Sequence, residues 1–88
     1  MPPTFIVKNR YGKKLGELIF SKKKFTVKIT FPEDRKNLEE LLSTSVKEGI
    51  RNLGEVVLDK PLKLGDPLFF KALEDLLIRK GYLVVVKK

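Results

Sequence analysis

Residues 66–86, DPLFFKALEDLLIRKGYLVVV, decide the fold of this chain. Asp66 and Pro67 are typical of a helix start, because an aspartate oxygen can accept hydrogen bonds from free backbone N–H groups and proline fits the first helical position. Gly81 suits the left-handed residue that follows a helix. The apolar residues between them recur at helical spacing, at Phe69, Leu73, Leu76 and Leu77. The stretch therefore predicts an amphipathic helix.

A short apolar run follows this helix and predicts a buried strand: Leu83, Val84, Val85 and Val86. These four residues are apolar on both faces of the strand, whereas a strand with one face in water alternates between apolar and polar residues. We therefore expect something besides the helices to cover the second face. A second copy of the chain is one candidate, which makes these residues a possible interface. The curled N-terminal part of the sheet is the other candidate.

The N-terminal third predicts three strands, at residues 4–10, 15–21 and 25–31. Turn signals separate them, first Tyr11-Gly12 with the two lysines that follow and then Ser21 with three lysines. The third strand alternates, with Phe25, Val27, Ile29 and Phe31 on one face. We expect an antiparallel meander with one buried face and one face in water.

Between the meander and residues 66–86, the pattern predicts one helix and one short strand. Pro32, Glu33 and Asp34 suit a first helical turn, and Gly49 suits the end of that helix. Residues 55–58 predict a short strand, and residues 50–54 fit no single element. The order is then β-β-β-α-β-α-β, an α+β domain. Because crossover units are almost always right-handed and parallel, we expect a C-terminal β-α-β unit in a mixed sheet with two helices packed on it.

Length and composition limit the class of protein. The chain has 88 residues, of which 42% are hydrophobic and 34% charged, so we expect one domain over residues 1–88 with frayed ends at 1–3 and 87–88. It contains no cysteine and no histidine, which excludes disulfides, thiol catalysis, zinc sites of Cys or His, and histidine-based triads. The lysine-rich composition suits a thermophilic source. No stretch predicts a membrane span or a secretion signal, so we expect a cytoplasmic protein.

The positive charge is concentrated near the N-terminus. The net charge is +8, and residues 1–32 hold eight basic residues against one acid, Glu17. The basic residues are Lys8, Arg10, Lys13, Lys14, Lys22, Lys23, Lys24 and Lys28. Clustered lysines on hairpin turns can contact the phosphates of a nucleic acid. The alternative is that they only keep exposed strands soluble and unpaired. Base stacking would require Tyr11 or Tyr82, and we expect each to pack at the rim of the core.

Other kinds of site have weaker support. Asp66 with Pro67, and Pro32 with two acids, make both helix starts unsuitable for phosphate. Asp59 and Asp66 could hold a metal or act as acid and base, but a turn residue and a helix cap explain them as well. We predict no catalytic residues, no metal and no cofactor. The sequence thus favours a small non-enzymatic module that binds nucleic acid or another polyanion. The alternative is an assembly module that forms a homo-oligomer through residues 83–86.

Overall fold

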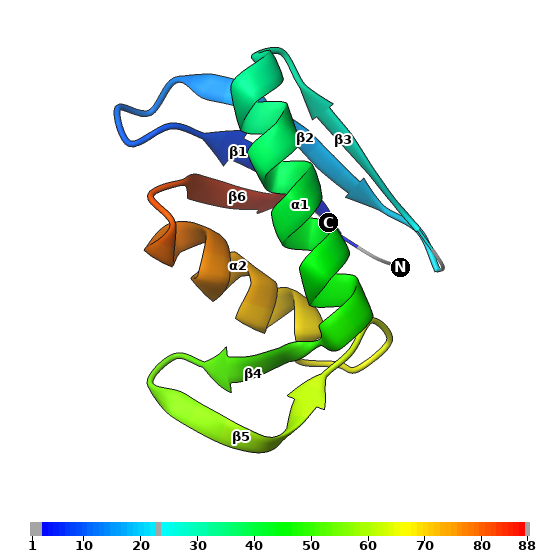
Figure 1. Ribbon diagram of the computed structural model, residues 1–88. Helices are drawn as coiled ribbons and strands as arrows, with labels where there is room; N and C mark the ends of the chain where they lie inside the picture. Colours follow the sequence, from blue (N-terminus) through cyan, green and yellow to red (C-terminus); the bar gives the residue numbers. More distant parts are fainter. Residues whose placement is uncertain (1–2, 23, 88) are drawn as a thin grey trace.

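The computed structural model describes residues 3–22 and 24–87, which form eight elements in one domain (Figure 1). In chain order they are β1 (Thr4–Lys8), β2 (Lys14–Phe20), β3 (Phe25–Ile29), α1 (Pro32–Glu48), β4 (Ile50–Leu53), β5 (Val56–Leu62), α2 (Phe69–Arg79) and β6 (Leu83–Lys87). The α+β class, the N-terminal meander and the two helices are confirmed. The order is βββαββαβ, with one more strand than the sequence predicts.

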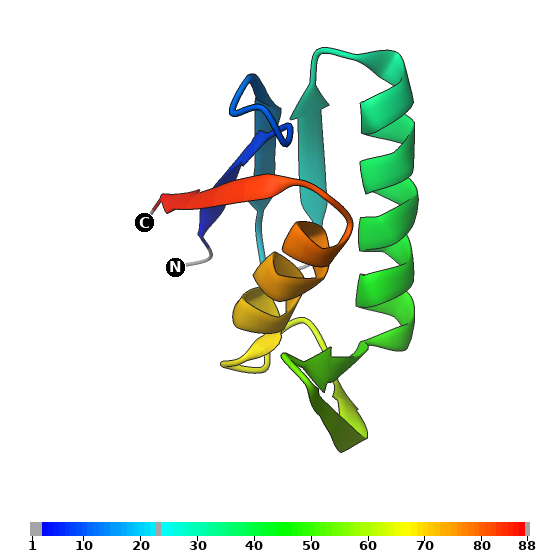
Figure 2. The same ribbon diagram turned by 90° about the vertical axis from the view of Figure 1, so that its left-hand side faces the viewer.

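Four strands form an antiparallel sheet in the order β3-β2-β1-β6. β1 is central, pairing with β2 on one side and with β6 on the other, so the two ends of the chain lie together in the sheet. Both helices pack on the same face of this sheet (Figure 2). We call that face inner and the opposite face outer. The inner face carries the core, and the outer face remains uncovered by the described residues.

The expected mixed sheet with a parallel β-α-β unit is wrong. β4 pairs with β5 across a two-residue turn to form a separate antiparallel hairpin, with Leu53 opposite Val56. The two strands satisfy each other's backbone groups locally, which leaves β5 outside the main sheet. β6 instead pairs antiparallel with β1, with Ile6 opposite Val85.

The two helix starts had different outcomes. α1 begins at Pro32, carries Glu33 and Asp34 in its first turn, and ends at Gly49, as predicted. α2 begins at Phe69, after Leu68 as cap, so the predicted start at Asp66 is wrong. The reason is local, because an Asp66 oxygen accepts a hydrogen bond from the Lys63 N–H at 2.7 Å. That carboxylate closes a turn and does not cap the helix.

Aromatic rings fill the centre of the core between the inner sheet face and α2. Phe5 and Phe69 are fully buried, and Phe20 is nearly so. Phe70 contacts all three, with ring centroids 5.0 to 6.2 Å apart in edge-to-face geometry. Edge-to-face pairs are the favoured arrangement of aromatic quadrupoles. α2 therefore packs into the centre of the core through its first two residues, Phe69 and Phe70.

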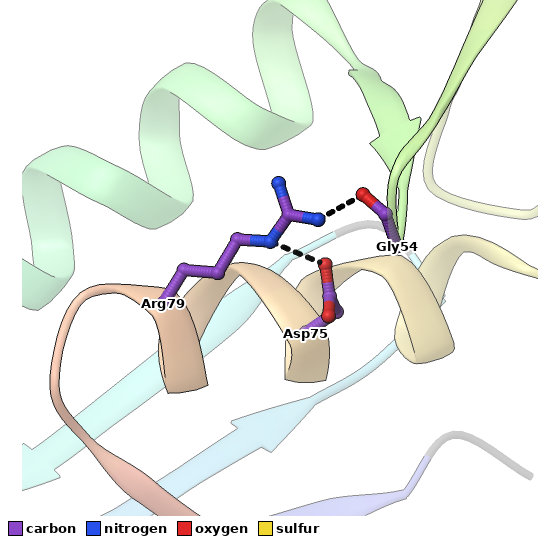
Figure 3. Close-up of polar contacts among 3 residues, drawn as sticks. All are labelled: Gly54, Asp75 and Arg79. Atoms are coloured by element: carbon purple, nitrogen blue, oxygen red, sulfur yellow. Dashed lines mark hydrogen bonds and ion pairs between the residues drawn. The ribbon is translucent and has the colours of Figure 1, made fainter.

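The β4–β5 hairpin lies beyond α2, on the side away from the main sheet (Figure 1). Arg79, at the end of α2, donates a hydrogen bond to the Gly54 carbonyl at the hairpin turn (Figure 3). Its Nε atom lies 3.0 Å from an Asp75 oxygen one helical turn earlier. Arg79 thus pairs with Asp75 within α2 and links the helix to the hairpin.

The ends of the chain and of β3 depart from the expected pattern. Lys87 pairs with Thr4 inside the sheet and is not frayed, whereas residues 1, 2 and 88 lie outside the described residues. Phe31 does not continue the buried face of β3, because it becomes the residue before α1 and is 39% exposed. Among the described residues, no helix is long and apolar enough to cross a membrane.

Candidate nucleic-acid interface

The β1–β2 turn brings four of the predicted cationic residues to one end of the sheet. Lys8 ends β1, Lys14 begins β2, and the two are Cα partners in the sheet. Arg10 and Lys13 lie in the turn between them and are exposed. These four residues, with Tyr11, are called the basic end below.

Asn9 braces this turn. Its side-chain oxygen accepts hydrogen bonds from the N–H groups of Tyr11 at 2.9 Å and Lys13 at 3.0 Å. Its own N–H donates to the Lys13 carbonyl, and its carbonyl accepts from the Gly12 N–H, both at 2.9 Å. Gly12 has a φ of +87°, a conformation that glycine adopts without strain. The turn is therefore held by its own backbone and by one asparagine.

Tyr11 projects into solvent from this braced turn. Its side chain is 86% exposed, so the expectation that it packs at the rim of the core is wrong. The neighbouring aromatic residue, Phe31, lies against Lys13, whose Nζ atom is 5.0 Å from the ring centroid. Tyr82 packs against the core and is half-buried, as predicted.

The outer face of the sheet continues from the basic end. Strand alternation and register place Lys8, Lys28 and Lys87 on this face. Glu17 is the acid among them, opposite Lys28 on the neighbouring strand. Its Oε1 atom lies 3.8 Å from the Lys14 Nζ atom, in a partly exposed ion pair of little energetic weight.

The second lysine turn lies at the other end of the sheet. Lys22 and Lys24 belong to the β2–β3 turn, which Ser21 braces by accepting from the Lys24 N–H and donating to the Lys24 carbonyl. β2 separates this turn from the basic end along its whole length (Figure 1). Lys23 lies outside the described residues. The eight predicted residues therefore do not form one cluster.

The helix layer on the other side of the sheet carries charges of both signs. α1 covers the inner face of the sheet and exposes four glutamates, Glu33, Glu39, Glu40 and Glu48, together with three basic residues, Arg35, Lys36 and Lys47. Burial, together with the charges of Asp34 and Glu33, raises the pKa of the Tyr82 hydroxyl above its ordinary value of 10.0. The fold thus places the acids other than Glu17 outside the main sheet, in the helix layer, the hairpin and the loop between them, which also carry basic residues.

The possible interface at residues 83–86 is divided between the two faces of β6. Val84 and Val86 point inward and pack against the core. Leu83 and Val85 point outward and are 44% and 47% exposed. Half of the apolar run is therefore explained by the fold, and the other half remains on the open outer face.

The carboxylates form no evident metal site. Among the described residues, no three acids are grouped so that they could hold an ion. Asp59 lies within β5, and Asp66 is occupied by its own turn. An open groove of about 440 Å³ lies between α1 and the turn before β6, lined by Asn37, Glu40, Leu41, Thr44, Lys80 and Tyr82. It contains none of the predicted site residues.

No family model, curated protein or solved structure matches this chain. The site therefore has to be judged from its own geometry. The exposed position of Tyr11 is the feature that sequence reasoning missed. Its signal is Asn9, because an asparagine two residues earlier can bond to the backbone of a turn and hold the turn away from the core.

Proposed function

We propose that the protein is a small non-enzymatic module that binds nucleic acid through phosphate contacts. The basic end and the adjoining outer face form the contact surface. One observation supports this most strongly: Lys8, Arg10, Lys13, Lys14 and Lys28 gather there with Glu17 as the accompanying acid. Such a surface attracts a polyanion more strongly than the helix layer does, because the basic residues of α1 lie among acids.

Lysine and arginine contacts of this kind position a phosphate backbone without identifying bases. Binding would release counterions from the nucleic acid, so affinity would fall steeply with salt. Because the two lysine turns lie apart, the proposal can name which lysines contact the nucleic acid, which the sequence alone does not indicate. Lys13 and Lys14 belong to the contact surface, whereas Lys22 and Lys24 lie at the far end of β2.

Two double variants with equal charge loss test this assignment. Lys13→Ser with Lys14→Ser removes two charges from the basic end, and Lys22→Ser with Lys24→Ser removes two from the far turn. Binding of a fluorescent oligonucleotide is measured by anisotropy across a salt series that begins at about 50 mM. The first variant should weaken binding and reduce the salt slope by about 1 to 2, at roughly 0.7 to 0.9 per lost contact. The second should match the unmodified protein.

Two results would contradict the proposal. One is no binding by the unmodified protein at about 50 mM salt, the condition that favours phosphate contacts most. The other is an equal loss in both variants, which would mean that the lysines act only through net charge. In the first case the lysines would serve to keep the strands soluble.

A second candidate function is self-association through the outer face of β6. It is favoured by the exposure of Leu83 and Val85 on a strand with a single neighbour in the sheet. Unpaired strand edges with apolar side chains are templates for further pairing. Sedimentation over a range of protein concentrations should then show a dimer that Val85→Lys converts to a monomer. A monomer at every concentration would exclude this candidate.

A further inference from the structure

We infer that the nucleic acid bound at the basic end is single-stranded and that the Tyr11 ring stacks on an unpaired base. This inference rests on the proposed function and names its substrate class. Phosphate contacts alone do not distinguish a duplex from a single strand. The feature that does so is an aromatic ring placed among the cations.

The Tyr11 side chain is positioned for contact with a ligand. It is 86% exposed, although tyrosine normally buries much of its ring against neighbouring side chains. The turn that carries it cannot easily fold down onto the sheet, because four hydrogen bonds made by Asn9 hold residues 9–13. The ring is therefore presented to solvent on a braced turn, so the backbone of the turn would lose little conformational entropy on binding.

The cations beside Tyr11 complete a surface for an unpaired nucleotide. Arg10 precedes it, and Lys13 and Lys14 follow it after Gly12. Lys13 is held in place over the Phe31 ring, with its Nζ atom 5.0 Å from the ring centroid. We expect the backbone phosphates beside a base stacked on the tyrosine to contact these side chains. Stacking platforms flanked by cations are how proteins bind single strands without sequence preference.

A duplex could use the cations but not the ring. Its bases are stacked on one another, so Tyr11 could contact only the outside of the helix. Inorganic polyphosphate offers charge and no base. The preference for a single strand should thus depend on Tyr11, while attraction to any polyanion should depend on Arg10, Lys13 and Lys14.

The first test compares Tyr11→Ala with Tyr11→Phe on three probes: a short oligothymidylate, a duplex of similar length, and polyphosphate. Tyr11→Ala should weaken oligothymidylate binding about 5- to 150-fold, the range for loss of one base–aromatic stack. It should change duplex and polyphosphate binding by less than about twofold, because no phosphate contact is lost. Tyr11→Phe should retain the affinity for all three, since the ring and not the hydroxyl stacks.

A second test observes the ring directly. The chain has two tyrosines and no tryptophan, so Tyr82→Phe leaves Tyr11 as the source of tyrosine fluorescence. Oligothymidylate should quench this emission as a base stacks on the ring. Polyphosphate should bind without comparable quenching.

The outcomes separate this inference from the proposed function. Binding of all three probes with no effect of Tyr11→Ala and no selective quenching would overturn the stacking role and leave phosphate binding intact. Absence of binding to any probe at about 50 mM salt would overturn both. Loss of binding to all three probes on Tyr11→Ala would also overturn the stacking role, because the tyrosine would then be supporting the turn.

Discussion

Gly16 lies where the backbone of β2 passes close to the backbone of β3. A Cβ atom at this position would lie 2.8 Å from the Ile29 Cα atom and would overlap the Lys28 carbonyl. The obstacle is backbone, so it cannot move aside without displacing β3. We expect Gly16→Ala to lower the free energy of unfolding by about 3 kcal/mol or more, the upper end of the range for overpacking.

Gly12 provides the matched control for that measurement. Its φ of +87° also disfavours alanine, but no atom lies within 4 Å of a Cβ atom built there. Gly12→Ala should therefore lower the free energy of unfolding by only about 1 kcal/mol, the cost of holding alanine in a left-handed conformation. Denaturant unfolding of the two variants should separate the effects. Equal destabilisation would show that strand contact at Gly16 is unimportant.

Tyr82 gives the protein a pH dependence in the alkaline range. Burial, then Asp34, then Glu33 raise its pKa above 10.0, so the folded protein keeps this proton at pH values where the unfolded chain has lost it. The stabilisation is complete below pH 10 and is lost as the pH rises through the folded-state pKa. Absorbance titration of Tyr11→Phe should show a single tyrosine ionising above 10.0, and Asp34→Asn should lower that value. A pKa of 10.0 or below before Asp34 is changed would contradict the assignment.

Single residues were predicted well where one local rule decided them. α1 begins at Pro32 and ends before Gly49, as predicted. Proline favours the first position of a helix, and glycine readily adopts the positive φ that follows a helix. Asp66 was misjudged because an aspartate can cap a helix or close a turn, and the Lys63 N–H was the nearer donor. Tyr11 was misjudged because composition does not reveal whether a turn reaches the core.

Among the elements, the β4–β5 hairpin was the least visible in the sequence. Val56 and Val57 are 60% and 71% exposed, so the strand does not follow the buried pattern that its apolar residues suggest. Its partner at residues 50–53 is short, and only its two middle residues, Arg51 and Asn52, are exposed. The pairing of β6 with β1 was also missed, since contacts between distant segments leave no local periodicity. The helices and the meander, which do have strong periodicity, were predicted.

Arg79 should control how firmly the hairpin is held against α2. Arg79→Ala removes the hydrogen bond to the Gly54 carbonyl and the ion pair with Asp75. The Arg79 and Asp75 side chains are partly exposed, so the substitution should lower the free energy of global unfolding by about 1 kcal/mol or less. Hydrogen exchange of the β4 and β5 amides should nevertheless accelerate, while amides of the main sheet stay protected.

The exposed Lys71 on the same helix provides the control for the hairpin measurement. Lys71→Ala removes a charge from α2 without touching the link to Gly54. It should leave exchange in the hairpin unchanged. Similar exchange rates in Arg79→Ala and Lys71→Ala would show that the hairpin is held by other contacts.

At the scale of the whole molecule, the fold places at opposite ends of the sheet basic residues that lie close together in the sequence. The basic character of the first 32 residues was evident from composition. Its distribution was not, because the sheet places Lys13 and Lys14 at one end of β2 and Lys22 and Lys24 at the other. α1, which carries acids and basic residues, lies across the sheet from the outer face (Figure 2). Only the folded chain therefore defines which cations can act together.

The most direct test of the proposed interface is an NMR titration of the isotope-labelled protein with a short oligothymidylate at about 50 mM salt. The account predicts that the largest amide shifts fall in residues 8–14, with smaller shifts at Lys28 and Lys87 on the outer face. The amides of Lys22, Lys24 and the exposed side of α1 should stay unchanged. Shifts centred on the β2–β3 turn or on α1, or no shifts at all, would contradict it.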